Sequence, residues 1–303
     1  MDRLTAMEMF VRIVETGSFS AVARELSTTQ PTISKQLTGL EKRLNTRLLN
    51  RSTRKLSLTE PGADYYERCK RIIDEVRDAE GTVGMLQASL AGTLHINSSI
   101  ALGQMFLTPA ILKFQQQHPG LTVELSLIDR FIDLVAEGVD VAIRIGRLTD
   151  STLIARRLGQ SRRLTVASPG YLAKHGMPKT PQDLQDHNCL LYSYLSTGNE
   201  WPFRGPEGEI RVKVAGNFKS NNGHALREAL IAGVGVATTP EWLAHDRIAT
   251  GEIVAILPEY TPLPFEINAV YSSNRHVSAK VRAFIEFLQV EFRAVPGFNA
   301  ENP

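Results

Sequence analysis

A run of hydrogen-bonding side chains between residues 29 and 38 has the chemistry needed to contact base edges and phosphates in a DNA major groove. Its hydroxyl, amide and ammonium groups include those of Thr29, Gln30, Thr32, Ser34, Lys35 and Thr38. Such groups read DNA only when one rigid element presents them together. The residues around them therefore decide the interpretation.

The apolar residues around this run predict two short helices joined by a tight turn. Ser20 can cap the first helix, which would pack through Ala21, Val22, Ala23 and Leu26. Thr29 can cap the second helix, and Pro31 suits a first turn because its missing N–H needs no partner there. A buried stripe then recurs at helical spacing: Ile33, Leu37, Leu40 and Leu44. The polar run falls off that stripe, which is typical of a helix-turn-helix.

The same pattern fits an ordinary amphipathic helix pair with a solvated polar face, and the local charge favours DNA. Residues 24–55 carry eight basic and two acidic side chains. Residues 56–90 carry four basic and seven acidic ones, and from residue 91 onward there are 20 of each. The formal net charge of +2 over 303 residues thus conceals a basic N-terminal region suited to a polyanion.

A short polar stretch after the second helix predicts a β-ribbon with a basic tip. Asn45 stands where that helix should stop, since Asn tolerates the left-handed backbone found at helix ends. The ribbon would be anchored by Leu48, Leu56 and Leu58 and would carry Arg51, Arg54 and Lys55 at its tip. Arg and Lys there can reach the DNA backbone or minor groove, as in a winged helix-turn-helix.

Residues 1–66 resemble the DNA-binding domain of LysR-type transcriptional regulators, through the run FVRIVETGSFSAVARELSTTQPTISKQLTGLEKRLNTRLLNRSTRKLSLTEPG. The family usually has Ala-Ala, Ser-Gln-Pro and Leu-Gly where this chain has Val22-Ala23, Thr29-Gln30-Pro31 and Leu44-Asn45. The expected DNA-binding residues are Ser20, Thr29, Gln30, Pro31, Thr32, Ser34, Lys35, Arg51, Arg54 and Lys55. Four further stretches extend the resemblance along the chain, namely GVDVAIRIG, ASPGYLAKHGMPKTPQDLQDHNCL, ALIAGVGVATTPEWL and KVRAFIEFL. Details such as RIG and DRFIDLVAEG are most similar to the subgroup of the meningococcal adhesion-gene regulator.

A long helix is predicted after Thr59, with Glu60 and Pro61 in its first turn. Its apolar residues alternate by four and three, as in a coiled-coil seam: Tyr65, Cys69, Ile72, Val76, Ala79, Val83, Leu86 and Leu90. A single amphipathic helix packed on its own domain is the alternative. Dimerisation is the favoured reading because a helix of about 40 Å is long for so small a domain. Cys69 would then be a small buried side chain on the seam.

The remaining residues alternate strand-like and helical segments, which predicts a parallel α/β region. We expect strands at 94–97, 122–128 and 139–145, with helices reaching Gln117 and Glu137 after the first two. The resemblance implies an α+β chain: a winged helix-turn-helix (1–59), a linker helix with a hinge (60–91) and a two-lobed effector domain (92–303) like that of periplasmic binding proteins. Lobe I would comprise 92–162 and 267–303, and lobe II 163–266.

Small anions bind beside helix N-termini at the ends of strands in such folds, which gives candidate effector contacts. These are Ser98, Ser99, Asp129, Arg144 and Asn221, with Ser99 at the position of a common effector-binding Ser in the family. Each could instead be a helix cap or, for Arg144, a salt-bridging residue. Trp201 and Phe203 could wall the pocket, although an aromatic pair on a strand is more often core.

Catalytic alternatives find little support. The seven His residues lack metal-ligand spacing, and no Gly-rich phosphate loop or G-x-S-x-G elbow occurs. Cys69 and Cys189 fall in different predicted domains, so a paired redox switch is not expected. No run of 18 apolar residues or signal peptide occurs, which favours a cytoplasmic protein.

We therefore expect a bacterial transcription regulator, not an enzyme, with no metal or cofactor. Its expected partners are double-stranded DNA, a small effector for which an anion would suit the site, and further copies of itself. The resemblance implies a dimer, commonly a tetramer, and allows RNA polymerase as another partner. The alternatives are an enzyme or ligand carrier that bears a DNA-binding module, and a constitutive DNA-binding protein without an effector.

Overall fold

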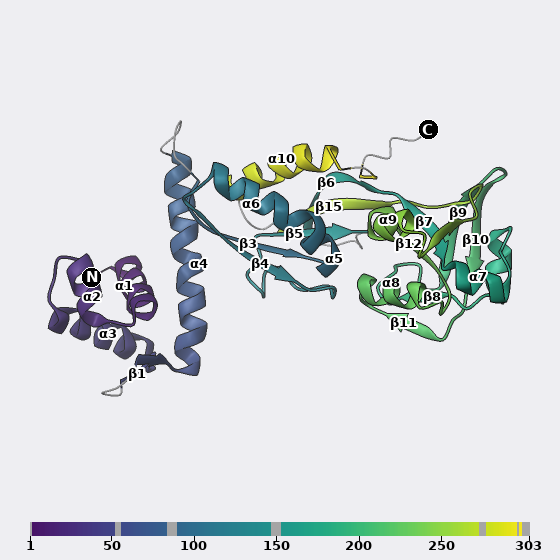
Figure 1. Cartoon of the computed structure of the whole chain (residues 1–303). Helices are drawn as coiled ribbons and strands as arrows, with labels where there is room; N and C mark the ends of the chain where they lie inside the picture. The colour runs from purple at the N-terminus through teal and green to yellow at the C-terminus, as the bar shows by residue number, and fades with distance from the viewer. Residues whose placement is uncertain are drawn as a thin grey trace. The chain divides into compact units, whose positions relative to one another are not determined.

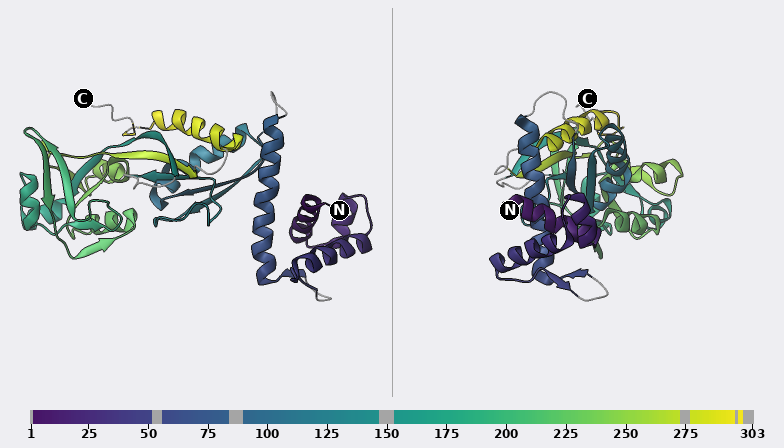
Figure 2. Two further views of the ribbon diagram at one scale, coloured as in Figure 1. Left: turned by 180° about the vertical axis from the view of Figure 1, so that it is seen from behind. Right: turned by 90° about the vertical axis from the view of Figure 1, so that its left-hand side faces the viewer.

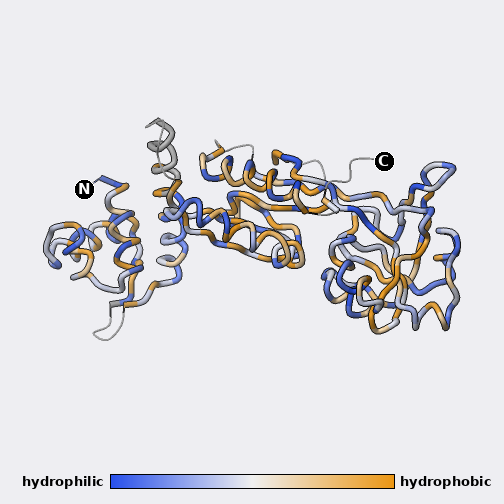
Figure 3. The backbone as a smooth tube through the Cα atoms, turned by 45° about the horizontal axis from the view of Figure 1, so that its top comes forward, coloured by the Kyte–Doolittle hydropathy of each residue, from blue (hydrophilic) through white to orange (hydrophobic). Residues whose placement is uncertain are grey.

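The computed structural model describes residues 2–51, 56–83, 90–146, 153–272, 277–295 and 297–298. The chain divides into two compact units, Met1–Ala88 and Ser89–Pro303, which we call the N-terminal unit and the C-terminal unit (Figure 1). Hydrophobic and hydrophilic residues alternate along the helices of both units (Figure 3). No described helix combines the length and apolarity needed to cross a membrane.

The N-terminal unit is a winged helix-turn-helix. Its elements are α1 (Arg3–Thr16), α2 (Phe19–Glu25), α3 (Gln30–Leu44), β1 (Leu49–Arg51), β2 (Leu56–Leu58) and α4 (Glu60–Val83). Thr29 caps α3 by accepting a hydrogen bond from Thr32 N, and Asn45 ends it with a φ of 50°. Strands β1 and β2 pair antiparallel, so the predicted ribbon is confirmed.

Two details of the predicted helix packing are wrong. Ser18, not Ser20, caps α2, because its side chain accepts from Ala21 N. Leu26 and Leu44 are 47% and 37% exposed, whereas Ile33, Leu37 and Leu40 are buried as expected. Both exposed leucines lie at helix ends, where the chain turns away from the core.

Helix α4 forms a wall of the N-terminal core. Tyr65, Cys69 and Ile73 pack into that core, with the Tyr65 ring centroid 5.6 Å from that of Phe10 in α1. The sequence placed Tyr65 and Cys69 on the dimer seam. That prediction is wrong for these two residues, because their side chains pack within their own unit. Ile72 is 40% exposed on the outer side. Side chains of Ala79 and Val83, and residue Leu86, lie outside the described residues.

One lobe of the C-terminal unit, here called the first lobe, is built on a five-stranded sheet of order β4-β3-β5-β15-β6. The strands are β3 (Gly92–Ser98), β4 (Leu121–Leu127), β5 (Val141–Ile145), β6 (Leu153–Ser161) and β15 (Phe265–Ser272). The helical segments are α5 (Ile100–Leu102), the π-helix η1 (Gly103–Leu107), α6 (Thr108–Gln117) and α10 (Ala279–Arg293). Their apolar residues form one large core with the sheet, including Phe114 of α6 and Phe284 of α10.

This sheet is mixed, which corrects the expected parallel arrangement. Strands β3, β4 and β5 run parallel, but β15 pairs antiparallel with both β5 and β6. The helix expected up to Glu137 does not form. The Asp133 carboxylate instead accepts hydrogen bonds from Val135 N and Ala136 N at 2.9 and 3.1 Å, which fixes a turn.

The other part of the C-terminal unit, the second lobe, has three small sheets, ordered β12-β7-β13, β11-β8 and β10-β9-β14 (Figure 2). Its strands are β7 (Arg163–Ala167), β8 (Leu190–Tyr192), β9 (Glu200–Gly205), β10 (Gly208–Lys213), β11 (Phe218–Ser220), β12 (Val236–Pro240), β13 (Val254–Ile256) and β14 (Thr261–Pro262). Its helices are α7 (Pro169–His175), the 3₁₀ helix η2 (Pro181–Asp186), α8 (Gly223–Ile231) and α9 (Glu241–Ala249). The chain passes between the lobes twice, after β6 and before β15.

Candidate functional site

The first candidate site is the exposed face of α3. Gln30, Pro31 and Lys35 are exposed, whereas Thr32 and Ser34 are half-buried. Buried Ile33 and Leu37 fix the opposite face of the helix in the core. The sequence prediction that the apolar stripe turns these polar residues outward is therefore confirmed for Gln30 and Lys35.

Hydrogen bonds orient several of the predicted DNA-contact residues. Ser20, on α2, donates to Gln30 Oε1 at 3.1 Å and so joins the two helices beside the exposed face. The hydroxyl groups of Thr29 and Thr32 lie 2.8 Å apart within the helix cap. Ser20 therefore orients Gln30 on this surface, whereas the sequence predicted that it would cap α2.

The wing is attached to α3 by a carboxylate that the sequence did not single out. Glu41 Oε1 accepts hydrogen bonds from Leu48 N at 2.9 Å and from Leu49 N at 3.3 Å. Thr59 N donates to Leu48 O at 3.0 Å, and a Cβ at Gly62 would lie 1.9 Å from that oxygen. The wing therefore starts from a fixed point beside α3. The side chain of Arg51, and residues Arg54 and Lys55, lie outside the described residues.

The second candidate site is a cavity of about 130 Å³ in the C-terminal unit. The first lobe lines it with Ser99, Asp129 and Arg144, among others, and the second lobe contributes side chains from β7, β8, β12 and α8. Much of the lining is aromatic or aliphatic. Trp201 touches the cavity while it is also buried in the second-lobe core, whereas Phe203 belongs to the core alone.

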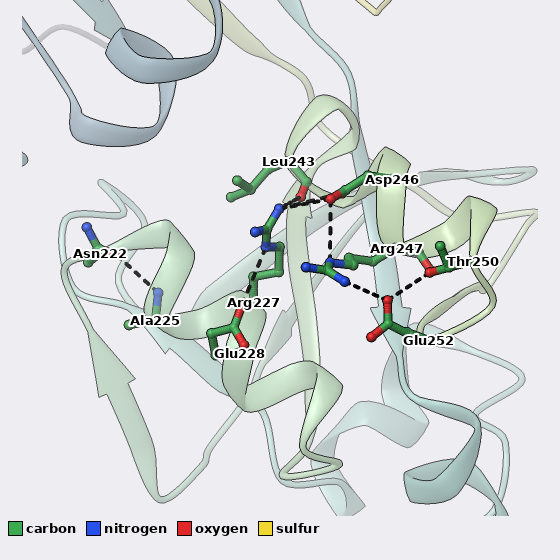
Figure 4. Close-up of polar contacts among 9 residues, drawn as sticks. All are labelled: Asn222, Ala225, Arg227, Glu228, Leu243, Asp246, Arg247, Thr250 and Glu252. Atoms are coloured by element: carbon green, nitrogen blue, oxygen red, sulfur yellow. Dashed lines mark hydrogen bonds and ion pairs between the residues drawn. The ribbon is translucent and has the colours of Figure 1, made fainter.

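Two of the five predicted effector contacts do not line this cavity. Ser98 is fully buried, and its hydroxyl donates to Ile143 O at 3.3 Å, so it belongs to the sheet. Asn221 lies near Tyr194, with 3.5 Å between Nδ2 and the phenol oxygen. The neighbouring Asn222 caps α8 instead, by accepting from Ala225 N (Figure 4). The sequence does not show which way a side chain points at the end of a strand or at the start of a helix. It therefore could not separate Ser98 and Asn221 from the residues that line the cavity.

Asp129 joins the two lobes at the edge of the cavity. Its Oδ1 accepts from Ile100 N of α5 at 3.0 Å, and its Oδ2 accepts from Asn222 Nδ2 at 2.8 Å. The carboxylate thus lies at the N-termini of one helix from each lobe, where negative charge is stabilised. The second of these bonds is a direct contact between the two lobes.

Arg144 brings a buried positive charge to the cavity. Its side chain is on β5, the residue is 8% exposed, and Nη2 has no hydrogen-bond partner among the residues that the structure describes. The guanidinium carbon lies 5.8 Å from the ring centroid of Phe131. Burial lowers the pKa of Arg144, while the neighbouring Tyr192 and Asp129 act in the opposite direction. The sequence identified this residue because it closes a strand.

Arg163 is a second buried arginine at the cavity that sequence reasoning missed. The residue is 3% exposed, and burial lowers its pKa to about 9. Its Nη1 donates to Leu263 O at 3.4 Å and Nη2 donates to Thr238 Oγ1, whereas Nε has no partner within the described part of the chain. The guanidinium carbon lies 4.1 Å from the ring centroid of Phe265. No local signal distinguishes it in the sequence from its exposed neighbour Arg162.

A third arginine at the cavity, Arg227, is already paired. From α8 it reaches Leu243 O at 3.5 Å and the Asp246 carboxylate at 3.4 Å, and it lies beside Glu228 (Figure 4). Arg247 and Glu252 continue this network away from the cavity. The charge of Arg227 is therefore compensated outside the cavity.

Within the described ranges, no group of three His, Cys, Asp or Glu side chains could hold a metal ion. Both cysteines are buried and unpaired, Cys69 in the N-terminal unit and Cys189 in the C-terminal unit. The polar groups among the residues that line the cavity are guanidinium, hydroxyl and carboxylate groups, and much of the remaining lining is apolar.

Both units match known protein families. Residues 4–63 match the bacterial regulatory helix-turn-helix protein, lysR family, and residues 87–293 match the LysR substrate binding domain. An HTH-type transcriptional regulator of Haemophilus influenzae is 38% identical over 281 residues, which cover 93% of this chain and 98% of that protein.

The regulator CrgA of Neisseria meningitidis is similar in both sequence and structure. Its sequence is 36% identical over 288 residues, covering 94% of this chain and 95% of CrgA. The solved CrgA structure aligns with a TM-score of 0.59 at 34% identity and covers 95% of this chain and 98% of that one.

Proposed function

Because the chain belongs to the LysR family of DNA-binding transcriptional regulators, which carry an effector-binding domain and are not enzymes, we propose that it works as follows. The exposed face of α3 reads the operator, the wing neutralises phosphate, and the cavity of the C-terminal unit binds a small anionic effector. The buried, partly unpaired guanidinium of Arg144 in an otherwise mainly apolar cavity is the observation that carries the effector proposal.

For DNA binding, we assign two roles: residues of one group contact base edges, and residues of the other group contact phosphates. Gln30 and Lys35 are exposed on α3 and reach base edges or adjacent phosphates, with Ser20 and Thr29 supporting them. Pro31, Thr32 and Ser34 complete the contact surface. Arg51, Arg54 and Lys55 act as phosphate anchors.

Fluorescence anisotropy with matched and single-base-changed operators tests this division. Gln30→Ala should cost about 1–3 kcal/mol on the natural operator and relax specificity at one position. Arg54→Ala should weaken all duplexes alike and lower the salt slope by about one unit. Equal losses on every duplex for both variants would contradict the proposal. Lys213→Ala, in the C-terminal unit, is the charge control.

For effector binding, Ser99, Asp129 and Arg144 form a polar edge around an apolar cavity. The guanidinium would pair with a carboxylate or phosphate, and Ser99 would contribute its hydroxyl at the start of α5. Asp129 of the first lobe accepts a hydrogen bond from Asn222 of the second lobe. A ligand that contacts both lobes therefore shifts the equilibrium between arrangements of the lobes and thereby changes the state of the DNA-binding unit.

A thermal-shift screen of small anions, followed by titration calorimetry, tests the effector site. Arg144→Met should abolish binding of any anion found, and Ser99→Ala should cost about 1–2 kcal/mol. Arg156→Met, on the exposed part of β6, is the matched control and should bind normally. Unchanged binding by Arg144→Met would move the site elsewhere. If no small molecule binds, the chain is a constitutive regulator.

We also propose that the chain pairs with a second copy through the outer face of α4, where Ile72 lies. An Ile that is 40% exposed on a helix with charged neighbours such as Arg71 is a poor solvent-facing residue but a good seam residue. Two such units would bind the two halves of a palindromic operator.

A further inference from the structure

A hydrogen bond from the neighbouring helix orients the side-chain amide of Gln30. The hydroxyl of Ser20, on α2, donates to Gln30 Oε1 at 3.1 Å, and both side chains are exposed. The nearby hydroxyl groups of Thr29 and Thr32 lie 2.8 Å from each other. Among the described residues, no group accepts a hydrogen bond from Gln30 Nε2. The oxygen of the amide is therefore engaged within the protein, and its nitrogen is available to a ligand.

The two helices that carry this hydrogen bond pack on one core. Val22 of α2 and Ile33 of α3 are both fully buried in the N-terminal unit. The turn between the helices is closed by Thr28 N, which donates to Ala23 O at 2.8 Å. The fold thus brings the hydroxyl and the amide together before any DNA is bound, so that little further ordering is needed to orient the amide.

The two ends of an amide recognise different bases in a major groove. The Nε2 group donates hydrogen bonds, so it fits O6 of guanine or O4 of thymine. N6 of adenine and N4 of cytosine are themselves donors, and a donor that faces Nε2 is left unpaired. Gln recognises adenine when its oxygen and its nitrogen both face the base. In this chain the oxygen could bind N6 only by sharing or losing the hydrogen bond from Ser20.

We propose that Ser20 makes Gln30 selective for a keto base, guanine or thymine, at the operator position that Gln30 contacts. This inference rests on the proposed role of Gln30 as a DNA-reading residue. Ser20 is a positioning residue, because it holds the amide oxygen toward α2 and leaves Nε2 to face the DNA. Adenine and cytosine are disfavoured there because their amino groups meet a second donor.

The test measures base preference with the full-length protein. Selection from a randomised duplex library supplies a binding site, and fluorescence anisotropy then compares duplexes that carry each of the four bases at each position. The position read by Gln30 is the one at which Gln30→Ala no longer discriminates among the bases. There the unaltered protein should bind the guanine or thymine duplex about three- to tenfold more tightly than the adenine and cytosine duplexes.

Two results separate this inference from the proposed function. A preference for adenine or cytosine at that position would overturn the inference, because the amide oxygen would then have to face the DNA, and Gln30 would still be a reading residue. If Gln30→Ala discriminates among bases at every position as the unaltered protein does, Gln30 does not read DNA. Both the inference and that part of the proposed function would then be wrong.

Variants of Ser20 test its positioning role. Ser20→Ala leaves the amide free to turn, so the preference for keto over amino bases should fall toward one at this position and stay unchanged elsewhere. Ser20→Thr keeps the hydroxyl and should keep the preference. Ser57→Ala removes an exposed hydroxyl from β2 and is the matched control. If Ser20→Ala weakens all four duplexes alike and leaves the preference unchanged, Ser20 does not orient Gln30.

Discussion

Replacement of Glu41 by Ala should loosen the wing without unfolding the helix-turn-helix. The carboxylate lies at 2.9 Å from Leu48 N and at 3.3 Å from Leu49 N, and both amides belong to residues with buried side chains. Removal of the acceptor leaves two backbone donors beside the core without the carboxylate that α3 supplies to them. Water can reach them only if the wing stem moves.

The magnitude follows from the two contacts. A hydrogen bond to a charged group contributes about 1.5–3 kcal/mol, and the longer of these two bonds contributes less. Because Glu41 is partly solvated, we expect a local loss of about 2 kcal/mol, which corresponds to roughly thirtyfold more frequent opening of the stem. Glu41→Gln keeps an uncharged acceptor and should lose about half as much free energy.

Hydrogen-exchange mass spectrometry of the full-length protein measures this directly. Peptides that cover residues 46–58 should exchange about thirtyfold faster in Glu41→Ala, while peptides from α1 keep their protection. Glu67→Ala removes an exposed acid from α4 and controls for the change in net charge. If wing exchange is unchanged in Glu41→Ala, or equally fast in Glu67→Ala, the carboxylate does not hold the wing.

Three further predictions use the same reasoning. Gly62→Ala should lower the melting temperature of the protein, because the new Cβ would meet the carbonyl oxygen of Leu48 at the wing. Gly39→Ala, with open space around it, should raise the free energy of unfolding by about 1 kcal/mol in urea unfolding. A reversed order of the two variants would contradict the packing at the wing stem. Ile72→Asp should leave the far-UV circular dichroism intact and abolish α4-mediated pairing in sedimentation velocity, and an unchanged sedimenting species would exclude that seam. Burial raises the pKa of the Cys69 thiol to about 11 and that of Cys189 to about 12, so at pH 8 both stay protonated and should react with a disulfide reagent only after unfolding; prompt reaction of the native protein would contradict their burial.

The N-terminal unit was largely predictable because its determinants are local. The α3 cap, the proline in its first turn, the buried stripe and the Asn45 stop are each fixed by neighbours within a few residues. The LysR resemblance, the fold class and the regulator function inferred from the sequence are confirmed. Glu41 was missed because its partners lie seven and eight residues away, beyond the reach of helix periodicity.

The C-terminal unit was less predictable because its details depend on long-range pairing. Residues 128–137 have enough apolar side chains for a helix, but the Asp133 carboxylate captures two nearby amides and forms a turn. Ser98 and Ser99 are adjacent, yet only Ser99 lines the cavity. Arg163 meets Phe265 about a hundred residues later in the chain, and no pattern along the sequence reveals that contact.

Cys69 and Ile73 of helix α4 pack in the core, whereas Ile72 lies on its outer face. Adjacent helix residues differ by about 100° in direction, so the core fixes how far α4 can turn about its axis relative to α3. If two copies meet along α4, any change in their meeting angle cannot be absorbed within either N-terminal unit. It must appear as rigid-body displacement of one recognition helix against the other. The regulated quantity would then be the separation and bend of the two half-sites, which lie about 34 Å apart for one DNA turn. The affinity of a single half-site would stay constant while the acceptable operator geometry changes.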